Sequence, residues 1–207
     1  CVMSLTTQLG RETNIFHAAP ETVNHIILNS PVLSQRKLRQ LVRSAPYDRL
    51  HAQIDLSYAP EEGLKAGIER ICREAEQAAR DGKVMLLLTD RYPVRGRPMV
   101  HALLATGAVH HHLSDKGLRC DVNLIIETGT ARDAHHMACL IGVGATAVYP
   151  YLAYQTLFDL GRRGILKLKK GGEVTQIGRS YRKGINKGLS KIISKMGICT
   201  IASYRGA

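Results

Sequence analysis

The segment His110–His112 holds three consecutive histidines, and His135–His136 follows it by about two dozen residues. Imidazole is a common metal ligand and a general acid or base near neutral pH. Consecutive residues on a helix are rotated by about 100°, so adjacent histidines cannot converge on one ion. Metal-binding helices space their ligands three or four residues apart. A metal site would therefore need one histidine from each segment and an acid such as Asp115 or Asp133.

Packing and exposure to solvent are the alternative roles of these histidines. In the first helix, His111 continues the predicted inner face, and His110 and His112 lie on its flanks. The rest of that face is apolar or small: Val100, Leu103, Leu104 and Gly107. In the second helix, His136 lies opposite the predicted inner face, which consists of Ala134, Met137, Ala138 and Ile141. The periodicity therefore favours hydrogen-bonded and surface histidines over a metal centre.

Two glycine-containing segments resemble anion-binding loops. In "IGVGATA" (141–147) the glycines follow a helical pattern and precede an apolar run, which is the order of a helix end. "ETGTAR" (127–132) has the order strand, glycine and helix N-terminus, so an anion could bind there, but an ordinary turn has the same pattern. No GxxxxGK[ST], GxSxG or Cys–His signature is present.

A lysine stripe runs along the C-terminal part of the chain. Residues 161–207 hold 12 Lys and Arg against one acid, and the preceding 160 residues hold 17 against 16. On a helix predicted over Tyr181–Met196, lysines recur at steps of four: Lys183, Lys187, Lys191 and Lys195. The apolar side of that helix is formed by Ile185, Leu189, Ile192 and Met196. Such a stripe binds phosphates or an acidic membrane surface, or it is a solvated or partner-facing helix face.

Four short apolar runs predict the buried strands that would position these residues: 52–56, 84–88, 122–126 and 146–150. Helical patterns lie between them. Three strand–helix–strand units predict an α/β fold with a parallel sheet and right-handed crossovers. Ligands in such folds bind at the carboxyl ends of the strands, so the candidate loops are "TDRYPVRGRP", "ETGTARD" and "YPYLAYQ".

The helices are predicted from their capping residues and from the helical spacing of their apolar residues. Residues 60–82 predict one helix, with Pro60 at its start, Gly82 at its end and a buried stripe of Leu64, Ile68, Ile71, Cys72 and Ala75. "TARD" resembles a capping box, so another helix is predicted from Thr130 to about 142–144. One helix is expected in "SPVLSQRKLRQLVRS", within an otherwise irregular first 50 residues. A polar connector is expected over 169–180, and a last strand over Ile198–Ser203.

The chain has 207 residues, which is enough for one full core. No apolar run approaches the ~18 residues that span a bilayer. The five cysteines are scattered without CxxC spacing, which is typical of reduced thiols in a cytoplasmic protein: Cys1, Cys72, Cys120, Cys139 and Cys199. Because position 1 is not Met and the last residues resemble a strand, we expect a piece of a longer polypeptide.

Several long stretches resemble the large (alpha) subunit of glutamate synthase: "VMSLTTQLGRETNIF", "LNSPVLS", "GAVHHHL", "NLIIETGTARDAHHMACLIGVGATAVYPYLAYQTL" and "SYRKGINKGLSKIISKMGICTIASYRGA". The resemblance covers nearly the whole chain. It assigns 1–172 to the C-terminal part of the family's central domain and 173–207 to the beginning of its FMN-binding (β/α) barrel domain. It also implies a β/α-barrel-like architecture, with an incomplete barrel in this chain.

The resemblance implies an oxidoreductase of ammonia assimilation and glutamate biosynthesis in nitrogen metabolism. The complete subunit makes L-glutamate from 2-oxoglutarate and glutamine-derived ammonia by reductive amination at FMN, and a 3Fe–4S cluster feeds electrons to the flavin. The electrons come from NADPH or NADH through a small subunit, or from ferredoxin. This chain would be an interdomain scaffold, inactive alone and binding neither cofactor, with the other domains of the same subunit as its partners.

The same resemblance places Ser203, Tyr204 and Arg205 near the flavin site, because barrels bind ligands at the carboxyl ends of their strands. Cys1 is not the amidotransferase nucleophile, since "CVMSLTT" matches an internal stretch of the family. No catalytic residue, metal ligand, membrane or nucleic-acid partner is expected. One alternative is a stand-alone nucleic-acid-binding module that uses the lysine helix. The other is a histidine metalloenzyme.

Overall fold

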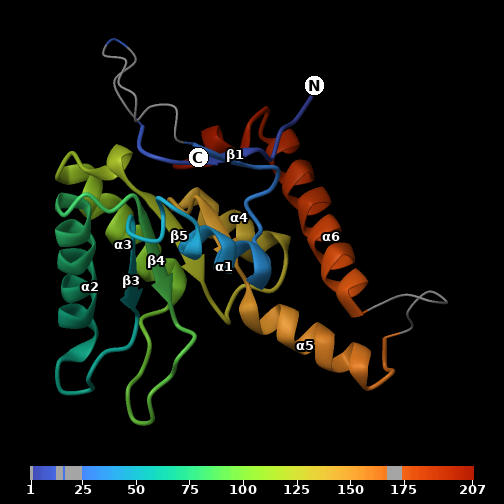
Figure 1. Ribbon diagram of the computed structural model, residues 1–207, viewed down its shortest axis with the longest axis horizontal. Coiled ribbons are helices and arrows are strands. Elements are labelled where there is room, and N and C mark those ends of the chain that lie inside the picture. The colour runs from blue at the N-terminus through green and yellow to red at the C-terminus, as the bar shows by residue number, and fades with distance from the viewer. Residues whose placement is uncertain (1, 13–15, 17–24, 167–173) are drawn as a thin grey trace.

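The structure is a computed structural model, and it describes residues 2–12, 16, 25–166 and 174–207. Its centre is a four-stranded parallel sheet with helices on both faces (Figure 1). In sheet order the strands are β3 (His51–Asp55), β4 (Met85–Thr89), β5 (Asn123–Glu127) and β6 (Ala147–Tyr149). The predicted α/β class and all four predicted strands are confirmed. Within the described residues the sheet is open and does not close into a barrel.

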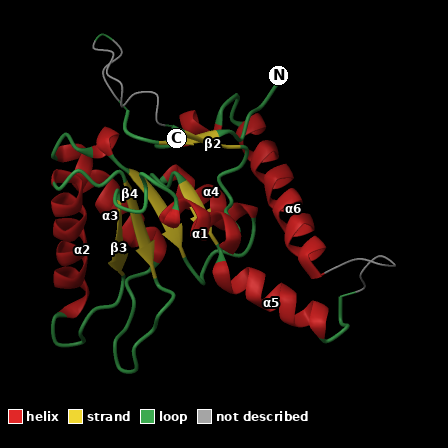
Figure 2. Ribbon diagram, in the orientation of Figure 1, coloured by secondary structure: helices red, strands yellow, loops and turns green. Residues whose placement is uncertain are grey.

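Three helices connect these strands in turn, which confirms the predicted strand–helix–strand units (Figure 2). They are α2 (Gly63–Arg80), α3 (Ala102–Asp115) and α4 (Ala134–Gly142). A short 3-10 helix, η2 (Arg119–Asp121), follows α3. β4, β5 and β6 alternate their side chains between two cores, because successive residues of a strand point to opposite faces. These three strands are buried throughout, whereas the edge strand β3 exposes Gln53 and Asp55.

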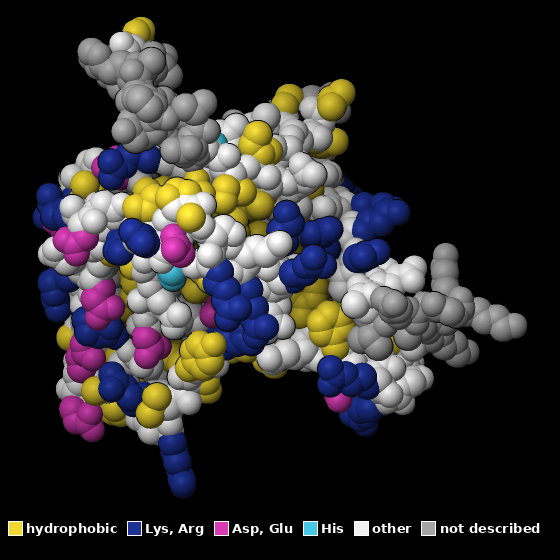
Figure 3. All heavy atoms as spheres, in the orientation of Figure 1, with side chains coloured by type: hydrophobic (Ala, Val, Ile, Leu, Met, Phe, Trp, Pro, Cys, Tyr) yellow, Lys and Arg dark blue, Asp and Glu magenta, His cyan; other side chains and the backbone are white. Residues whose placement is uncertain are grey.

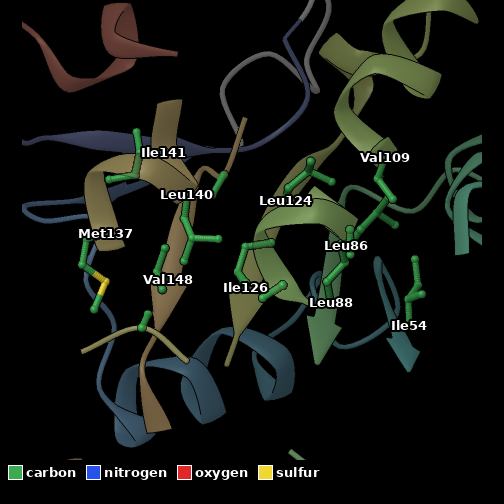
Figure 4. Close-up of a cluster of buried hydrophobic side chains, with 14 of the residues drawn as sticks. Ile54, Leu86, Leu88, Val109, Leu124, Ile126, Met137, Leu140, Ile141 and Val148 are labelled. Carbon is green, nitrogen blue, oxygen red and sulfur yellow. The ribbon is translucent and has the colours of Figure 1, made fainter. Parts of the chain in front are cut away.

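The first core lies between the sheet and the helices α2, α3, α4 and α6 (Val174–Lys195). Figure 4 shows its central part, where side chains of the four strands face those of α3 and α4. The labelled residues are Ile54, Leu86, Leu88, Leu124, Ile126 and Val148 from the strands, and Val109, Met137, Leu140 and Ile141 from the helices. Gly188 of α6 lies so close to α4 that a Cβ there would stand 2.4 Å from that of Ala134.

The second core lies on the opposite face of the sheet, under the N-terminal elements and α5 (Tyr151–Arg162). The N-terminal elements are β1 (Thr7–Leu9), β2 (Ile26–Leu28) and α1 (Gln35–Arg43). β1 and β2 form an antiparallel pair that sequence periodicity did not reveal, whereas the predicted helix in the first 50 residues is confirmed as α1.

The segment before α1 extends the sheet beyond β6. Val32 makes a parallel bridge with Val148, in which the Leu33 N–H donates to the Val148 carbonyl at 2.8 Å. The Val148 N–H donates in turn to the Pro31 carbonyl at 2.8 Å. Ser34 follows at once as the N-cap of α1 and accepts a hydrogen bond from the Lys37 N–H. The N-terminus of α1 therefore lies at the carboxyl edge of the sheet.

The C-terminal prediction was partly wrong. The expected strand Ile198–Ser203 is instead a single bridge between Thr200 and Ser4, followed by the 3-10 helix η3 (Ile201–Tyr204). A strand needs a partner along its length, and the described residues offer this segment only that one bridge. The expected connector 169–180 is shorter than predicted, because α6 already begins at residue 174.

Other boundaries and faces also differ from the predictions. α4 is capped by Asp133, whose carboxylate accepts the His136 N–H at 3.0 Å, and not by Thr130. α2 begins at Gly63, after a turn over residues 60–62, and Leu64 is 45% exposed. Its buried stripe comprises Gly67, Ile71, Cys72, Ala75 and Ala79. In the described part of the chain, no helix combines the length and the hydropathy required to cross a bilayer.

Candidate functional site

Polar side chains line the carboxyl edge of the sheet, where the sequence predicts ligand-binding loops. The last residues of three adjacent strands pair in register: Thr89 with Glu127, and Glu127 with Tyr149. Glu127 is 4% exposed, so its carboxylate needs partners inside the protein. The Thr89 hydroxyl donates to one oxygen at 2.7 Å, and Arg91 donates to the other at 2.8 Å. Both oxygens of the buried carboxylate are therefore engaged.

Arg91 connects this carboxylate to three aromatic rings. Its guanidinium lies 5.8 Å from the ring centres of Tyr92 and Tyr149 and 5.5 Å from that of Tyr151. Burial disfavours the charged guanidinium, but the hydrogen bond and the charge of Glu127 outweigh it, so the pKa of Arg91 lies above its usual value. Arg91 is thus a permanent cation with its counter-charge in contact.

Asp90 holds the loop "ETGTAR" (127–132), which resembles an anion-binding loop, in place. Its carboxylate accepts the Gly129 N–H at 2.9 Å and the Thr128 hydroxyl. The Tyr151 hydroxyl donates to the Asp90 carbonyl at 3.3 Å, which ties the segment after β6 to the same point. The N–H group that an external anion would use at "ETGTAR" therefore already binds an internal carboxylate. The segment is an ordinary strand-to-helix turn, closed by hydrogen bonds.

A pocket of about 600 Å³ lies beside this turn. Its polar lining comes mainly from the start of α4 and the turn before it: His101, Thr130, Arg132, His135, His136 and Cys139. Cys139 Sγ lies 3.7 Å from His135 Nε2, one helical turn away. Among the described residues, no three His, Cys, Asp or Glu side chains converge as a metal site would require.

The three consecutive histidines diverge as the helix geometry predicts, and they are hydrogen-bonded or exposed as expected, but the orientation of His111 differs from the prediction. His110 is partly buried, and its Nδ1 accepts the Arg119 Nε–H at 2.9 Å. His112 Nε2 lies 2.7 Å from the carboxylate of Glu76 on α2. His111 is exposed, so the prediction that it points inward was wrong.

The face of α3 that is buried explains this error. Its buried residues are Ala102, Ala105, Thr106, Val109 and Leu113, and Leu104 is 46% exposed. The true face is therefore rotated away from His111, because small residues face the sheet where larger ones were expected. In α4 the prediction was better, since Met137, Ala138 and Ile141 are buried.

Arg119 holds the helix end at "IGVG" in place. Its guanidinium donates to the carbonyls of Val122 at 2.8 Å and Gly144 at 2.7 Å, in addition to His110. Burial, with a contribution from the charge of Arg205, lowers the pKa of Arg119 to about 10. Gly144 has φ +121° and closes α4 through its N–H bond to Ile141, so the prediction of a helix end is confirmed.

The lysine stripe of α6 is exposed as predicted: Lys183, Lys187, Lys191 and Lys195. Its inner side is formed by Ile185, Leu189 and Ile193, whereas Ile192 is only partly buried and Met196 is 50% exposed. Figure 3 shows Lys and Arg side chains gathered along α6 and over α1 on one face of the molecule.

The proposed flavin-site residues lie away from the loops that follow β4, β5 and β6. Tyr204 packs beside Gly142 at the end of α4, and the Gly206 N–H donates to the Gly142 carbonyl at 2.7 Å. This is the amino edge of the described sheet. Ser203 contacts the Thr200 hydroxyl at 3.0 Å. The placement of Ser203, Tyr204 and Arg205 near FMN stays a prediction, and Cys1 lies outside the described residues.

At the carboxyl edge, the carboxylates of Asp90 and Glu127 position the loops through hydrogen bonds within the chain. The apolar runs predicted the three loops but did not single out their central residues Asp90, Arg91 and Glu127. The sequence does mark these residues, because charged side chains stand at the ends of two apolar runs. Asp90 and Arg91 follow the run in "LLLTDR", and Glu127 ends the run in "LIIET". Only the pairing of β4 with β5 brings these residues together.

Comparison with known proteins assigns the chain to a family. The glutamate synthase central domain family matches residues 1–207. The chain is 38% identical to ferredoxin-dependent glutamate synthase 2 of Arabidopsis thaliana and 38% identical to the glutamate synthase [NADPH] large chain of Bacillus subtilis, and each match covers 100% of this chain and 13% of the relative. It is 37% identical to glutamate synthase [NADH] of Saccharomyces cerevisiae, over 100% of this chain and 10% of the relative.

Solved structures give weaker matches. A flavocytochrome b2 mutant is 12% identical with a TM-score of 0.48, over 85% of this chain and 38% of that chain. This likeness is too low to support an argument on fold or function.

The relatives found by sequence are glutamate synthases, of which this chain spans only a small part. On the family match and the sequence identities, the chain belongs to the glutamate synthase central domain family.

Proposed function

We propose that this chain is the scaffold part of a glutamate synthase, which makes L-glutamate from 2-oxoglutarate and glutamine-derived ammonia by reductive amination at FMN. The observation that carries the proposal is the family match over all 207 residues. The internal hydrogen bonding of the carboxyl edge supports a structural role, because Glu127 and Asp90 are already engaged with groups of the chain itself. The chain would hold neighbouring domains of the same polypeptide in place.

The cofactors would be held by other parts of the polypeptide. A 3Fe–4S cluster requires several convergent thiolates, and the described cysteines do not converge: Cys72 is buried in the first core, whereas Cys120 and Cys199 are exposed at other places. FMN would supply hydride chemistry when bound to the complete subunit. In this chain, Ser203, Tyr204 and Arg205 remain the proposed neighbours of its site, and no step is assigned to them.

The domain division and the partners are also proposals. The family match runs through the proposed boundary between 172 and 173, and α6 packs into the same core as α4. The partners would be the other domains of the subunit and either a small subunit or ferredoxin, since the relatives' names include [NADPH], [NADH] and ferredoxin-dependent enzymes. A cytoplasmic location also stays a proposal, since the name of one relative includes "chloroplastic".

The nucleic-acid alternative receives no support from the comparisons, because the relatives are glutamate synthases.

The test of the proposal uses the protein in the full length that its gene encodes. We expect it to form glutamate from 2-oxoglutarate and glutamine with a reductant, and to show flavin absorbance. The 207-residue chain alone should show neither.

A variant at Glu127 distinguishes a structural role of this chain from a catalytic one. Glu127→Gln should lower the thermal stability of the full-length protein, but the turnover per bound flavin should stay close to that of the wild type. Stoichiometric flavin binding by the isolated chain, or loss of turnover per flavin in a folded Glu127→Gln protein, would contradict the scaffold role.

A further inference from the structure

A cleft of about 650 Å³ lies between the start of α1, the side of α5 and the start of α6. It is within the ~300–1,000 Å³ range of small-ligand sites. Four cationic side chains line it, Arg36, Lys37, Arg179 and Arg182, and no acidic residue is among its lining residues. Within the described residues, none of these four cations forms an ion pair. The cleft thus has an uncompensated positive charge.

The backbone adds to this charge. The first-turn N–H groups of α1 have no partners within the helix, and among the described residues only the Lys37 N–H is capped, by Ser34. Hydrogen bonds between Val148 and the Pro31–Leu33 segment hold this N-terminus at the carboxyl edge of the sheet. Parallel α/β folds bind anions at such a helix start, where N–H groups and the helix dipole favour negative charge.

A buried hydroxyl is the independent sign of a ligand. Tyr154 of α5 lines the cleft and is 4% exposed, and its hydroxyl has no hydrogen-bond partner among the described residues. A buried hydroxyl without a partner is costly, and native proteins rarely leave one. Burial raises the pKa of Tyr154 to about 12, against the opposing charge of Arg182, so the group is a neutral donor. A neutral donor that feels the charge of Arg182 is suited to an anionic oxygen.

The opposite wall of the cleft is apolar. Phe158 lies one helical turn from Tyr154, with ring centres 6.1 Å apart, and Gly178 of α6 faces both rings. A Cβ at Gly178 would stand 3.3 Å from each ring, so the glycine allows α6 to pack closely against both rings. In Figure 3, apolar surface lies between the cationic side chains over α1 and those on the α6 side.

We propose that this cleft binds a phosphate monoester that carries a flat apolar or aromatic body, the class to which nucleoside monophosphates belong. The phosphate lies at the α1 N-terminus with Arg182, Arg179 and the Tyr154 hydroxyl around it, and the body lies against Phe158. The site is distinct from the carboxyl-edge ion pair and does not depend on the proposed function.

Calorimetric titration of the protein, in the full length that its gene encodes, tests this site. The probes are AMP, inorganic phosphate and adenosine. We expect saturable binding of AMP that weakens with salt, weaker binding of phosphate, and the weakest binding of adenosine. Arg182→Ala should raise the Kd of AMP about tenfold or more, because it removes a charge-assisted hydrogen bond.

Two further variants keep the test independent of folding defects. Tyr154→Phe keeps the ring and removes only the hydroxyl, so it should raise the Kd of AMP by about threefold to tenfold. Phe158→Leu should weaken the binding of AMP more than that of phosphate, because it removes only the aromatic ring against which the body lies. Lys191→Ala is the matched control, since Lys191 is an exposed cation on the same helix outside the cleft.

Absence of saturable AMP binding would overturn the proposal, as would equal affinities in the wild type and Arg182→Ala. Equal losses in Lys191→Ala and Arg182→Ala would also overturn it, because they would indicate general attraction to a basic surface. If AMP does not bind and Arg182→Ala lowers the melting temperature of the protein, an acidic segment of the same polypeptide occupies the cleft, and the proposal fails.

Discussion

The guanidinium of Arg91 lies 2.8 Å from the carboxylate of Glu127, and this contact joins the segment after β4 to the last residue of β5. The side chains are only 19% and 5% exposed. A pair this buried is not a strong source of stability by itself, since desolvation offsets much of the attraction. Removing one partner of the pair is costly, because the other charge then stays buried without a counter-charge.

Glu127→Gln should therefore lower the free energy of unfolding by about 3–5 kcal/mol. Urea unfolding of the purified variant measures it. Asp159→Asn is the control, because Asp159 and Arg163 form a pair in which both side chains are more than 60% exposed. That change should cost less than ~1 kcal/mol. Equal costs in the two variants would mean that the Arg91–Glu127 pair is solvated.

Asp90→Ala should loosen the turn between β5 and α4. It leaves the Gly129 N–H and the Thr128 hydroxyl without their acceptor, at a cost of about 1–3 kcal/mol. Amide hydrogen exchange at Gly129 should become faster. Asp90→Asn retains an acceptor oxygen and should have a smaller effect; unchanged exchange in Asp90→Ala would refute this role.

His110 should make stability depend on pH. Burial, assisted by the charges of Arg119, His111 and Arg205, holds the pKa of His110 below its usual value of 6.5. The unfolded chain then binds a proton at higher pH than the folded chain, so stability falls as pH drops through about 6.5 and below. The His110→Asn variant keeps a side-chain oxygen that can accept the hydrogen bond from Arg119. Between about pH 7.5 and about pH 5.5, its free energy of unfolding should fall less than that of the wild type. Parallel curves for the two proteins would contradict this origin.

Gly184 and Gly188 should respond to alanine in opposite ways. A Cβ at Gly184 meets nothing within 4 Å, so Gly184→Ala should stabilise the protein by about 0.5–1 kcal/mol through helix propensity. A Cβ at Gly188 would stand 2.4 Å from that of Ala134, so Gly188→Ala should force α4 and α6 apart and cost about 1–3 kcal/mol. Chemical unfolding of both variants tests the pair. Stabilisation by both would exclude the close contact between these helices.

Much of the fold follows from local pattern. All four strands of the parallel sheet were predicted, and burial on both faces explains the apolar runs of β4, β5 and β6. The segment Ile198–Ser203 also contains β-branched residues, yet it is not a strand, since composition contains no information on whether a neighbouring strand is available. The orientation of α3 was missed for a related reason, because small buried residues such as Ala102 and Ala105 carry little hydrophobic signal.

The sequence by itself determined the α/β class, the order of the units, the exposed lysine stripe and the resemblance to glutamate synthase. Only the tertiary structure decided the ion pair at the carboxyl edge and the cleft at α1, because their residues come from segments far apart in the chain. Gly184 and Gly188 illustrate the difference. Each lies between a lysine and an aliphatic residue, so their local sequences are equivalent, and only the contact with Ala134 distinguishes them.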